Sequence, residues 1–482
     1  MTQNHEDYVK EITPQSEDFS QWYIDVIKKA QMVDYAPVKG CMVIRPYGFA
    51  IWENMKAGLD RRIKETGHEN AYFPIFIPES LLKKEAEHVE GFAPEVAWVT
   101  KGGQEELAEP LVVRPTSEAI IGDMYSRWIQ SWRDLPVLIN QWANVVRWEK
   151  ATRPFLRTSE FLWQEGHTAH RNEEEAEEET LKMLEVYREF AETDLAIPVI
   201  KGMKSEQEKF AGALRTYCIE ALMADGKALQ AGTSHNLGQH FAKVFDITFL
   251  DQDDERKYVW QTSWGLSTRM VGALIMVHGD DRGLKVPPKV APHQVVVVPI
   301  TPKNKREMVM EEAEKLTAQL KTSFRVKFDD REEHSPGWKF NEWEMRGVPI
   351  RLEIGPKDIE KNQVVLVRRD TGEKLFVKRD ELMEQLTDLL SDIQDNMYES
   401  AYKFMQENTR EAQDMDEFEE ILNDHMGMIK ASWCGANACE NEVKDRTKAT
   451  IRLIPFDPEV GGPCIACGKE QSSKKVLFAR AY

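Results

Sequence analysis

The chain lacks long apolar segments: no run approaches the ~20 consecutive apolar residues that a membrane-spanning helix requires. Its first residues, MTQNHEDYVKEITPQ, do not place a basic region before an apolar one, which argues against a signal peptide. Their acidic side chains argue against a transit peptide. We find no internal repeats and no low-complexity segments. These absences favour a cytoplasmic globular protein.

Cysteine and net positive charge are also scarce. Six cysteines among 482 residues exclude a disulfide-rich scaffold. The net charge of −19 argues against nucleic-acid binding by bulk charge. Local basic clusters such as 367–379 can still dock RNA. The acidic run at 171–180 is most simply a solvated helix face.

A chain of 482 residues is too long for one hydrophobic core and suggests about three domains. The pattern up to residue 288 is α+β, and three prolines at 287–292 mark a linker. Strand and helix patterns then alternate to about residue 385, and a long helix continues to about 409. We expect helices at 17–34, 48–67, 173–192, 205–225 and 303–321, and strands at 71–78, within 229–278, and at 294–300, 324–328, 349–354 and 363–368.

The most informative stretch is 146–170, VRWEKATRPFLRTSEFLWQEGHTAH. Two β-rich runs, 143–149 and 158–169, flank a Thr-Arg-Pro turn and predict an antiparallel hairpin. Its arginines suit a polyphosphate, its aromatic residues a flat ring, and its carboxylates a metal ion or an amine. The alternative is a sheet surface laced with salt bridges, which does not account for aromatic and histidine residues on the same ribbon.

This stretch resembles motif 2 of the class II aminoacyl-tRNA synthetases, in the form found in prolyl-tRNA synthetases. Four further blocks resemble that family in the same order: VRPTSEAII (113–121), LQAGTSHNLGQHF (229–241), SWGLSTRMVGALIMVHGDDRGLKVPP (263–288, containing motif 3) and VAPHQVVVVPI (290–300). The resemblance covers the whole chain. It implies a class II antiparallel-sheet catalytic domain of α+β type (1–288), an α/β anticodon-binding domain (289–385), and a linker helix with a small α+β zinc-type extension (386–482). The helix at 48–67 and the strand at 71–78 resemble motif 1, which implies a homodimer.

The resemblance also implies a reaction and its residues. L-Proline and ATP, with Mg²⁺, would give prolyl-adenylate, and the 3′-terminal adenosine of tRNA(Pro) would accept the prolyl group. Arg147 and Arg269 would be catalytic. The proline-binding residues would be Thr116, Glu118, Arg147, Trp163, Glu165, His167 and His235. The ATP-binding residues would be Arg147, Glu149, Arg157, Thr158, Phe161, Gln230, Thr233, Ser267 and Arg269.

Three of the proline-binding residues can also be placed by elementary geometry. Trp163, Glu165 and His167 alternate along one expected strand, so their side chains should share a face. For a lone histidine the usual interpretation is a hydrogen-bonded core residue. His167 and His235 both fall within matched motif blocks, which favours a site.

The chain departs from the family pattern at one position and lacks one feature. Thr268 precedes Arg269 where a glutamate is common, which leaves the role of that glutamate in doubt. The interval from His170 to Gln261 has no room for the large editing insertion found in one bacterial type. This absence points to the eukaryote- and archaea-like type.

The C-terminal segment contains Cys434-x4-Cys439 and Cys464-x2-Cys467, a spacing typical of a structural zinc site. Disulfides or free thiols are the alternatives, and a cytosolic setting disfavours disulfides. The segment resembles the zinc-binding extension of the same prolyl type, in which a terminal tyrosine, here Tyr482, folds towards the active site.

For the anticodon, the candidates in the α/β domain are Phe340, Glu342, Arg351, Glu353 and Lys357; a solvated charged face is the alternative for each. A threonine-type synthetase would need a zinc ligand set in the catalytic region, which the chain lacks. A synthetase-like RNA-binding or regulatory protein without ligase activity remains the alternative from another class. It would be expected to lose Arg147, Arg269 or Glu118.

Overall fold

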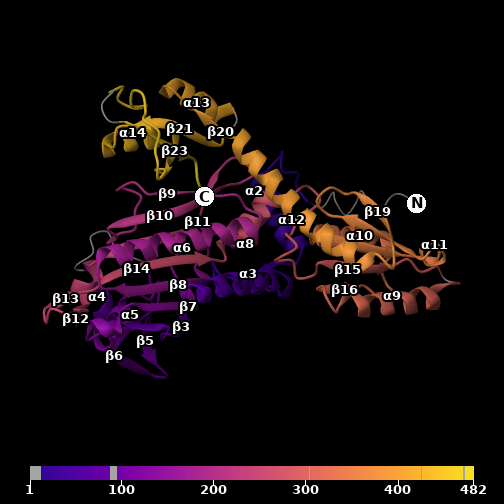
Figure 1. The fold of residues 1–482 in the computed structure, drawn as a ribbon, viewed down its shortest axis with the longest axis horizontal. Coiled ribbons are helices and arrows are strands. Elements are labelled where there is room, and N and C mark those ends of the chain that lie inside the picture. The colour runs from indigo at the N-terminus through magenta and orange to yellow at the C-terminus, as the bar shows by residue number, and fades with distance from the viewer. Residues whose placement is uncertain (1–11, 87–94, 303, 425, 470–472) are drawn as a thin grey trace.

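A computed structural model describes residues 12–86, 95–302, 304–424, 426–469 and 473–482. Residues 1–11, on which the prediction about targeting rests, lie outside the described residues. Figure 1 shows a large sheet region coloured indigo to magenta and an orange region at the opposite end of the long axis. Helix α12 (Leu382–Glu407) runs from the orange region back to a yellow C-terminal region beside strands β9 (Ile200–Met203) and β10 (Arg215–Leu222). No described helix is both long enough and apolar enough to span a membrane.

A seven-stranded sheet forms the centre of the first region, in the order β3-β7-β8-β14-β11-β10-β9. Every neighbouring pair is antiparallel except β3 and β7, as expected for a class II catalytic domain. The predicted hairpin is the β7–β8 pair. The strands are β3 (Glu69–Asn70), β7 (Val137–Val146), β8 (Glu160–His170), β9 (Ile200–Met203), β10 (Arg215–Leu222), β11 (Ala228–Gly238) and β14 (Trp260–Ser267).

Helix α6 (Glu173–Thr193) covers one face of this sheet. Its first turn holds three glutamates, where the helix dipole favours negative charge, and the Asn172 side chain accepts the Glu175 backbone N–H at 2.9 Å. On the buried side, Tyr187 is hydrogen-bonded to Gln164 of β8. Because successive residues of a strand point to opposite faces, Trp163 and Glu165 point away from α6. The second face of the sheet is therefore free to form a site.

Further elements surround the sheet, and helices α3 (Pro46–Glu65) and α8 (Arg269–His278) pack with α6 in one buried cluster. Helix α8 follows β14 directly, and α5 (Glu118–Trp128) follows a three-stranded sheet in the order β4-β6-β5. Helix α3 packs against α6. The remaining elements up to α8 are α2 (Phe19–Lys29), β1 (Val33–Tyr35), β2 (Met42–Ile44), β4 (Phe76–Pro78), α4 (Glu79–Ala86), β5 (Ala97–Gly102), β6 (Glu105–Val113), η1 (Trp132–Asp134), α7 (His240–Phe245), β12 (Thr248–Leu250) and β13 (Arg256–Tyr258).

The helix predicted at 205–225 is wrong. Residues 205–214 form turns, and strand β10 follows. Gly212 has φ of +85°, a conformation that interrupts a helix. The run 216–222, TYCIEAL, is buried throughout between β9 and β11, and its β-branched and aromatic residues suit that position.

Smaller differences occur elsewhere. Within 229–278 the expected strands are present, but residues 269–278 form helix α8. The strand expected at 71–78 is limited to β4 at its end. The helix expected at 17–34 ends at Lys29, and β1 begins at Val33. The α8 run is buried almost throughout, so the spacing of its apolar residues carries no helical period.

The orange region contains a five-stranded sheet in the order β16-β15-β17-β18-β19. Strands β15 (Val295–Pro299), β16 (Val326–Phe328) and β17 (Ile350–Ile354) are parallel, whereas β18 (Gln363–Arg368) and β19 (Lys374–Lys378) are antiparallel additions. The helices of this region are α9 (Arg306–Leu320), α10 (Pro336–Met345) and α11 (Pro356–Glu360). The predicted α/β character is confirmed, and two of the four strand pairings are parallel.

The yellow region is a small α+β unit with four strands in the order β20-β21-β23-β22. It consists of β20 (Thr409–Glu411), α13 (Met415–Asp424), β21 (Met428–Trp433), α14 (Asn437–Thr447), β22 (Thr450–Leu453) and β23 (Lys474–Ala479). A buried cluster joins it to the large sheet: Glu220 of β10 accepts hydrogen bonds from Lys204 and Arg452, both at 2.9 Å.

Candidate active site

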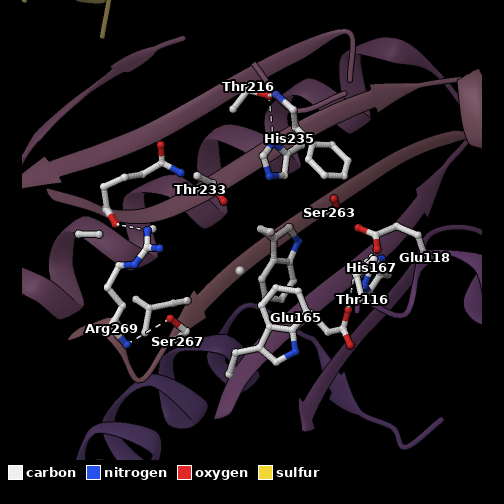
Figure 2. A pocket seen from close by; sticks show the side chains of 18 of the residues that line it. Thr116, Glu118, Glu165, His167, Thr216, Thr233, His235, Ser263, Ser267 and Arg269 are labelled. Atoms are coloured by element: carbon white, nitrogen blue, oxygen red, sulfur yellow. Dashed lines mark hydrogen bonds and ion pairs between the residues drawn. The ribbon is translucent and has the colours of Figure 1, made fainter. Parts of the chain in front are cut away.

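A cavity of 330 Å³ lies on the face of the large sheet opposite α6 (Figure 2). Strands β8, β10, β11 and β14 supply most of its lining, and the segment 208–210 also borders it. The lining includes the predicted residues Thr116, Glu118, Arg147, Phe161, Trp163, Glu165, His167, Gln230, Thr233, His235, Ser267 and Arg269. Four of the five sequence blocks that resemble the family therefore converge on one site.

Strand register explains why these side chains meet. Opposite His167 on β8 lies Ser263 on β14, then His235 on β11, then Thr216 on β10. This row of four crosses the sheet on its open face. Gly265, opposite Glu165, belongs to the next row, and a Cβ there would lie 3.3 Å from the Trp163 ring. The glycine leaves room for a ligand in the middle of the cavity.

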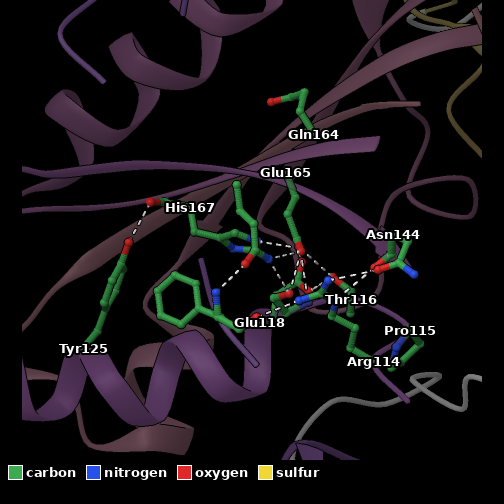
Figure 3. A network of polar contacts seen from close by, with 12 residues as sticks. Arg114, Pro115, Thr116, Glu118, Tyr125, Asn144, Gln164, Glu165 and His167 are labelled. Atoms are coloured by element: carbon green, nitrogen blue, oxygen red, sulfur yellow. Dashed lines mark hydrogen bonds and ion pairs between the residues drawn. The ribbon is translucent and has the colours of Figure 1, made fainter. Parts of the chain in front are cut away.

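One end of the cavity is acidic (Figure 3). Glu165 is buried and accepts hydrogen bonds from the Ser117 backbone N–H at 3.0 Å, the Ser117 hydroxyl at 2.5 Å and Gln141 at 3.0 Å. His167 Nε2 lies 2.9 Å from Glu165 Oε2. Glu118 accepts from the Thr116 hydroxyl. Two carboxylates thus face one imidazole.

The protonation states at this end follow from these contacts. Burial raises the pKa of Glu165, but hydrogen bonds from His167 and Ser117 outweigh burial and lower it below 4.5. Burial lowers the pKa of His167, but Glu165 and the charge of Glu118 outweigh it and raise it above 6.5. Two carboxylates and one imidazolium leave a net negative charge at this end of the cavity. This end therefore attracts a cation such as an ammonium group. The ligand atoms of Glu118, Glu165 and His167 lie within 4.8 Å of one another, a spacing that a metal ion also tolerates.

His235 differs from His167. Burial, aided by the charge of His167, lowers its pKa to about 3, so the ring is neutral. Its Nδ1 is hydrogen-bonded to the Thr216 hydroxyl at 2.9 Å, and the Phe210 ring lies 4.8 Å away between centroids. His235 therefore offers the cavity an uncharged, partly aromatic wall.

Two guanidinium groups also line the cavity. Arg147 donates from Nε to the Pro115 carbonyl at 3.0 Å and lies 5.4 Å from the Trp163 ring centroid. Arg269, the first residue of α8, donates from Nε to the Leu156 carbonyl at 3.1 Å. Burial lowers the pKa of both. Within the described parts of the chain, neither forms an ion pair with a carboxylate, so both can receive an anionic ligand.

Three predicted ATP-binding residues do not line the cavity. Glu149 and Arg157 lie on the connection between β7 and β8, with Arg157 Nη1 3.9 Å from Glu149 Oε2. Thr158 is buried, and its hydroxyl donates to the Glu160 carbonyl at 2.6 Å.

Ten lining residues were not predicted: Glu208, Lys209, Phe210, Thr216, Ala231, Gly232, Ser263, Trp264, Gly265 and Leu266. Ser263 and Gly265 could have been found, because the period of two along β14 carries to them from Ser267. Residues 208–210 were not predicted as lining residues because they fall within 205–225, where a helix was wrongly predicted.

The four C-terminal cysteines come together. Their Sγ atoms all lie within 4.8 Å of one another, with Cys434–Cys439 at 3.6 Å and Cys434–Cys467 at 3.9 Å. Tetrahedral zinc with Zn–S bonds of ~2.3 Å requires Sγ separations of about 3.8 Å, whereas a disulfide requires about 2.05 Å. Burial raises the pKa of Cys464, but backbone N–H groups, first that of Cys467, outweigh it and bring the pKa to about 7. The donor set therefore fits a closed structural zinc site.

The anticodon candidates separate into groups. Arg351 lies 4.2 Å from the Phe340 ring centroid and pairs with Glu353 at 2.9 Å. Glu342 is instead buried beside Arg331 and Arg346. Lys357 is exposed at the start of α11.

Tyr482 donates from its hydroxyl to Asp225 at 2.6 Å, and its ring lies 5.4 Å from the Arg153 guanidinium. The terminal residue therefore contacts both the turn between β10 and β11 and the connection between β7 and β8.

Comparisons with known proteins agree with this geometry. Residues 98–278 match the family described as "tRNA synthetase class II core domain (G, H, P, S and T)", which defines the class of the fold. Residues 294–389 match "Anticodon binding domain", and residues 415–482 match "Prolyl-tRNA synthetase, C-terminal". The chain belongs to the proline–tRNA ligase family of class II aminoacyl-tRNA synthetases.

Three curated relatives illustrate the extent of the match, and each is called proline–tRNA ligase. The protein of Natranaerobius thermophilus is 76% identical over 483 residues, with 100% of both chains covered. That of Alkaliphilus oremlandii is 60% identical, again with 100% of both chains covered. That of Symbiobacterium thermophilum is 60% identical, with 98% of this chain and 99% of its own covered.

Proposed function

We propose that the chain ligates L-proline to tRNA(Pro) in two steps. The proline carboxylate attacks the α-phosphate of ATP and releases pyrophosphate. The 3′-hydroxyl of the terminal tRNA adenosine then attacks the prolyl-adenylate carbonyl and releases AMP. The supporting observation is that one cavity is lined by two partly buried guanidinium groups, which form no ion pair with a carboxylate among the described residues, and by the carboxylates of Glu118 and Glu165. An amino acid joined to a nucleotide has the matching charges.

Proline occupies the acidic end in this proposal. Its secondary ammonium donates to Glu118 and Thr116, and Glu165 with His167 holds that end negative. Trp163 and His235 form walls for the ring. Among the described residues, Ser263 Oγ and Trp163 Nε1 are buried without a hydrogen-bond partner, which a bound substrate would supply.

ATP occupies the side of the two arginines. Arg147 lies between the two ends and binds both the α-phosphate and the proline carboxylate, while Arg269 binds the outer phosphates. Gln230, Thr233 and Ser267 contact the nucleotide, and the adenine stacks on Phe161. Glu149, Arg157 and Thr158 join them from the β7–β8 connection, which requires that connection to close over the nucleotide. Mg²⁺ bound with ATP supplies further neutralisation of phosphate charge.

The rate then comes from positioning and charge neutralisation. Attack of a carboxylate on a phosphate brings two anions together, and Arg147 offsets that repulsion where the charge develops. No protein general base is required for the first step, because the nucleophile is already ionised. Holding both reactants in one cavity removes the entropy cost of their encounter.

The remaining regions serve the tRNA and the assembly. We assign residues 1–288 to catalysis, 289–385 to anticodon binding through Phe340, Glu342, Arg351, Glu353 and Lys357, and 386–482 to a linker helix and a zinc-stabilised extension. A homodimer in the cytoplasm is the proposed working form. Exposed aromatic side chains within the segment that resembles motif 1, at Tyr72 and Phe76, support a dimer interface.

Amino-acid-dependent ATP–pyrophosphate exchange tests the assignment. Exchange should depend on proline among all standard amino acids, and charging should require tRNA(Pro). A chain that binds tRNA but gives no exchange with any amino acid would instead be a regulatory or RNA-binding protein.

A further inference from the structure

The C-terminal region is hydrogen-bonded to one loop of the catalytic region, residues 205–210. The Ser205 hydroxyl donates to Glu440 Oε1 at 2.6 Å, and Gln207 Nε2 donates to the Asn437 carbonyl at 3.1 Å. Asn437 and Glu440 both lie in the first turn of α14. Ser205 and Glu440 are buried, at 1% and 2% exposure. A partly exposed ion pair, Lys444–Glu208 at 3.6 Å, continues the contact.

The loop 205–210 borders the cavity. Glu208, Lys209 and Phe210 all line it. The Phe210 ring lies 4.8 Å from the His235 ring, measured between centroids. The backbone N–H of Phe210 donates to the Thr216 hydroxyl at 3.0 Å. Thr216 is in turn hydrogen-bonded to His235. A displacement of the loop at Ser205 would therefore alter the wall of the cavity beside His235.

The loop has a second anchor at its start. Lys204 is buried and donates to Glu220 Oε1 at 2.9 Å and to the Arg452 carbonyl at 2.7 Å. Its beginning is thus fixed from the same C-terminal region, and Gly212 at φ +85° ends it. Between these points its backbone–backbone hydrogen bonds are short-range: the Glu208 and Lys209 N–H groups donate to the Ser205 carbonyl, and the Ala213 N–H donates to the Phe210 carbonyl. Within residues 205–210, the Ser205 hydroxyl makes a buried side-chain contact with the C-terminal region.

We propose that Glu440 is a positioning residue for amino-acid binding: through Ser205 it holds the loop 205–210 so that Phe210 and His235 form one wall of the amino-acid pocket. Glu440 touches no substrate. This inference rests on the proposed placement of proline at the acidic end of the cavity. The inference gives the C-terminal extension a part in substrate binding in addition to its own folding. The two roles share one helix, since α14 carries both Glu440 and the cysteine Cys439.

Four variants of the full chain test the proposal in proline-dependent exchange. Glu440→Ala and Ser205→Ala each remove the same hydrogen bond, and each should raise KM for proline about tenfold, as expected for one buried hydrogen bond to a charged group. Their kcat and their KM for ATP should change by less than about twofold, the pattern of lost ground-state binding. Glu440→Gln keeps an oxygen acceptor for Ser205 and should behave like the wild type. Glu442→Gln, an exposed position on the same helix, is the matched control.

Two measurements separate positioning from folding. Zinc content and Tm should stay at control values in Ser205→Ala, which deletes a single hydroxyl. Trypsin should cleave after Lys209 faster in Glu440→Ala and Ser205→Ala, and saturating proline should slow that cleavage. The double variant should be no worse than either single one, because both remove one interaction.

The proposal is overturned if Ser205→Ala and Glu440→Ala match Glu442→Gln in KM for proline. It is also overturned if zinc content, Tm and both KM values change together, since that is a general structural effect. A change confined to KM for ATP would likewise contradict it. Glu165→Gln, assayed in parallel, tests the placement of proline by itself: an unchanged KM for proline there removes the placement whatever the Glu440 variants do.

Discussion

His167 Nε2 lies 2.9 Å from Glu165 Oε2, two residues away on the same strand and the same face of the sheet. The pair is buried, and the Ser117 hydroxyl and the Gln141 amide donate to the other carboxylate oxygen of Glu165, Oε1. This contact fixes both the orientation of the carboxylate and the charge at the acidic end of the cavity.

Glu165→Gln should therefore weaken amino-acid binding. The amide keeps the shape of the side chain but loses the negative charge. In addition, its NH₂ group cannot accept the hydrogen bonds that Ser117 and Gln141 donate to the carboxylate. We expect KM for proline in ATP–pyrophosphate exchange to rise by about tenfold to a hundredfold. Glu160→Gln, exposed on the same strand, should leave exchange unchanged. Equal behaviour of the two variants would contradict the role of Glu165.

The same pair predicts a pH dependence of stability. The pKa of His167 is raised above 6.5 in the folded chain, so its contribution is fully present below pH 6.5 and is lost as the pH rises through the folded value. Glu165, with its pKa lowered below 4.5, stays ionised throughout this range. The difference in Tm between the wild type and His167→Gln should be largest at about pH 6 and should shrink towards about pH 9. A difference that grows with pH would show that His167 is neutral in the folded chain.

The period of two in WQEGH made the shared face of Trp163, Glu165 and His167 predictable, because that pattern is local. The same rule, applied along β14, would have added Ser263 and Gly265. Phe210 could not be found in this way. The segment 205–225 has a helix-like start and an apolar run, and only pairing of β10 with a strand distant in sequence determines that it is extended. The resemblance, not periodicity, supplied Arg147 and Arg269.

The anionic end of the cavity yields a third prediction. Arg147→Ala should lower kcat for proline-dependent exchange by about a hundredfold to a thousandfold, the effect of removing one preorganised donor at a site of developing charge. Arg133→Ala removes an exposed guanidinium outside the cavity and serves as the control. Exchange kinetics at saturating proline and ATP provide the measurement. Near-normal exchange in Arg147→Ala would show that the cavity is not the site of activation.

The cysteine cluster yields a fourth prediction. Elemental analysis should find about one zinc ion per chain, and Cys434→Ser should lose it with a fall in Tm. Cys41→Ser, an isolated cysteine, should retain the metal. Because thiolates bind zinc and the pKa of Cys464 is about 7, zinc uptake by metal-free protein should weaken as the pH falls below 7. Full stability without metal, with a mapped disulfide, would contradict the site.

The fifth prediction concerns the five-stranded sheet. Arg351 on β17 presents its guanidinium 4.2 Å from the Phe340 ring, and Glu353 holds it at 2.9 Å. Guanidinium planes and aromatic rings are the surfaces on which unstacked RNA bases stack. Arg351→Ala should raise KM for tRNA in aminoacylation by about tenfold, since base stacking contributes on the order of 1–3 kcal/mol, and should leave proline-dependent exchange unchanged. Exchange without tRNA is the internal control, because it needs only the catalytic cavity. Equal losses in the two assays would show that Arg351 acts through folding, and the proposed anticodon surface would lose its support.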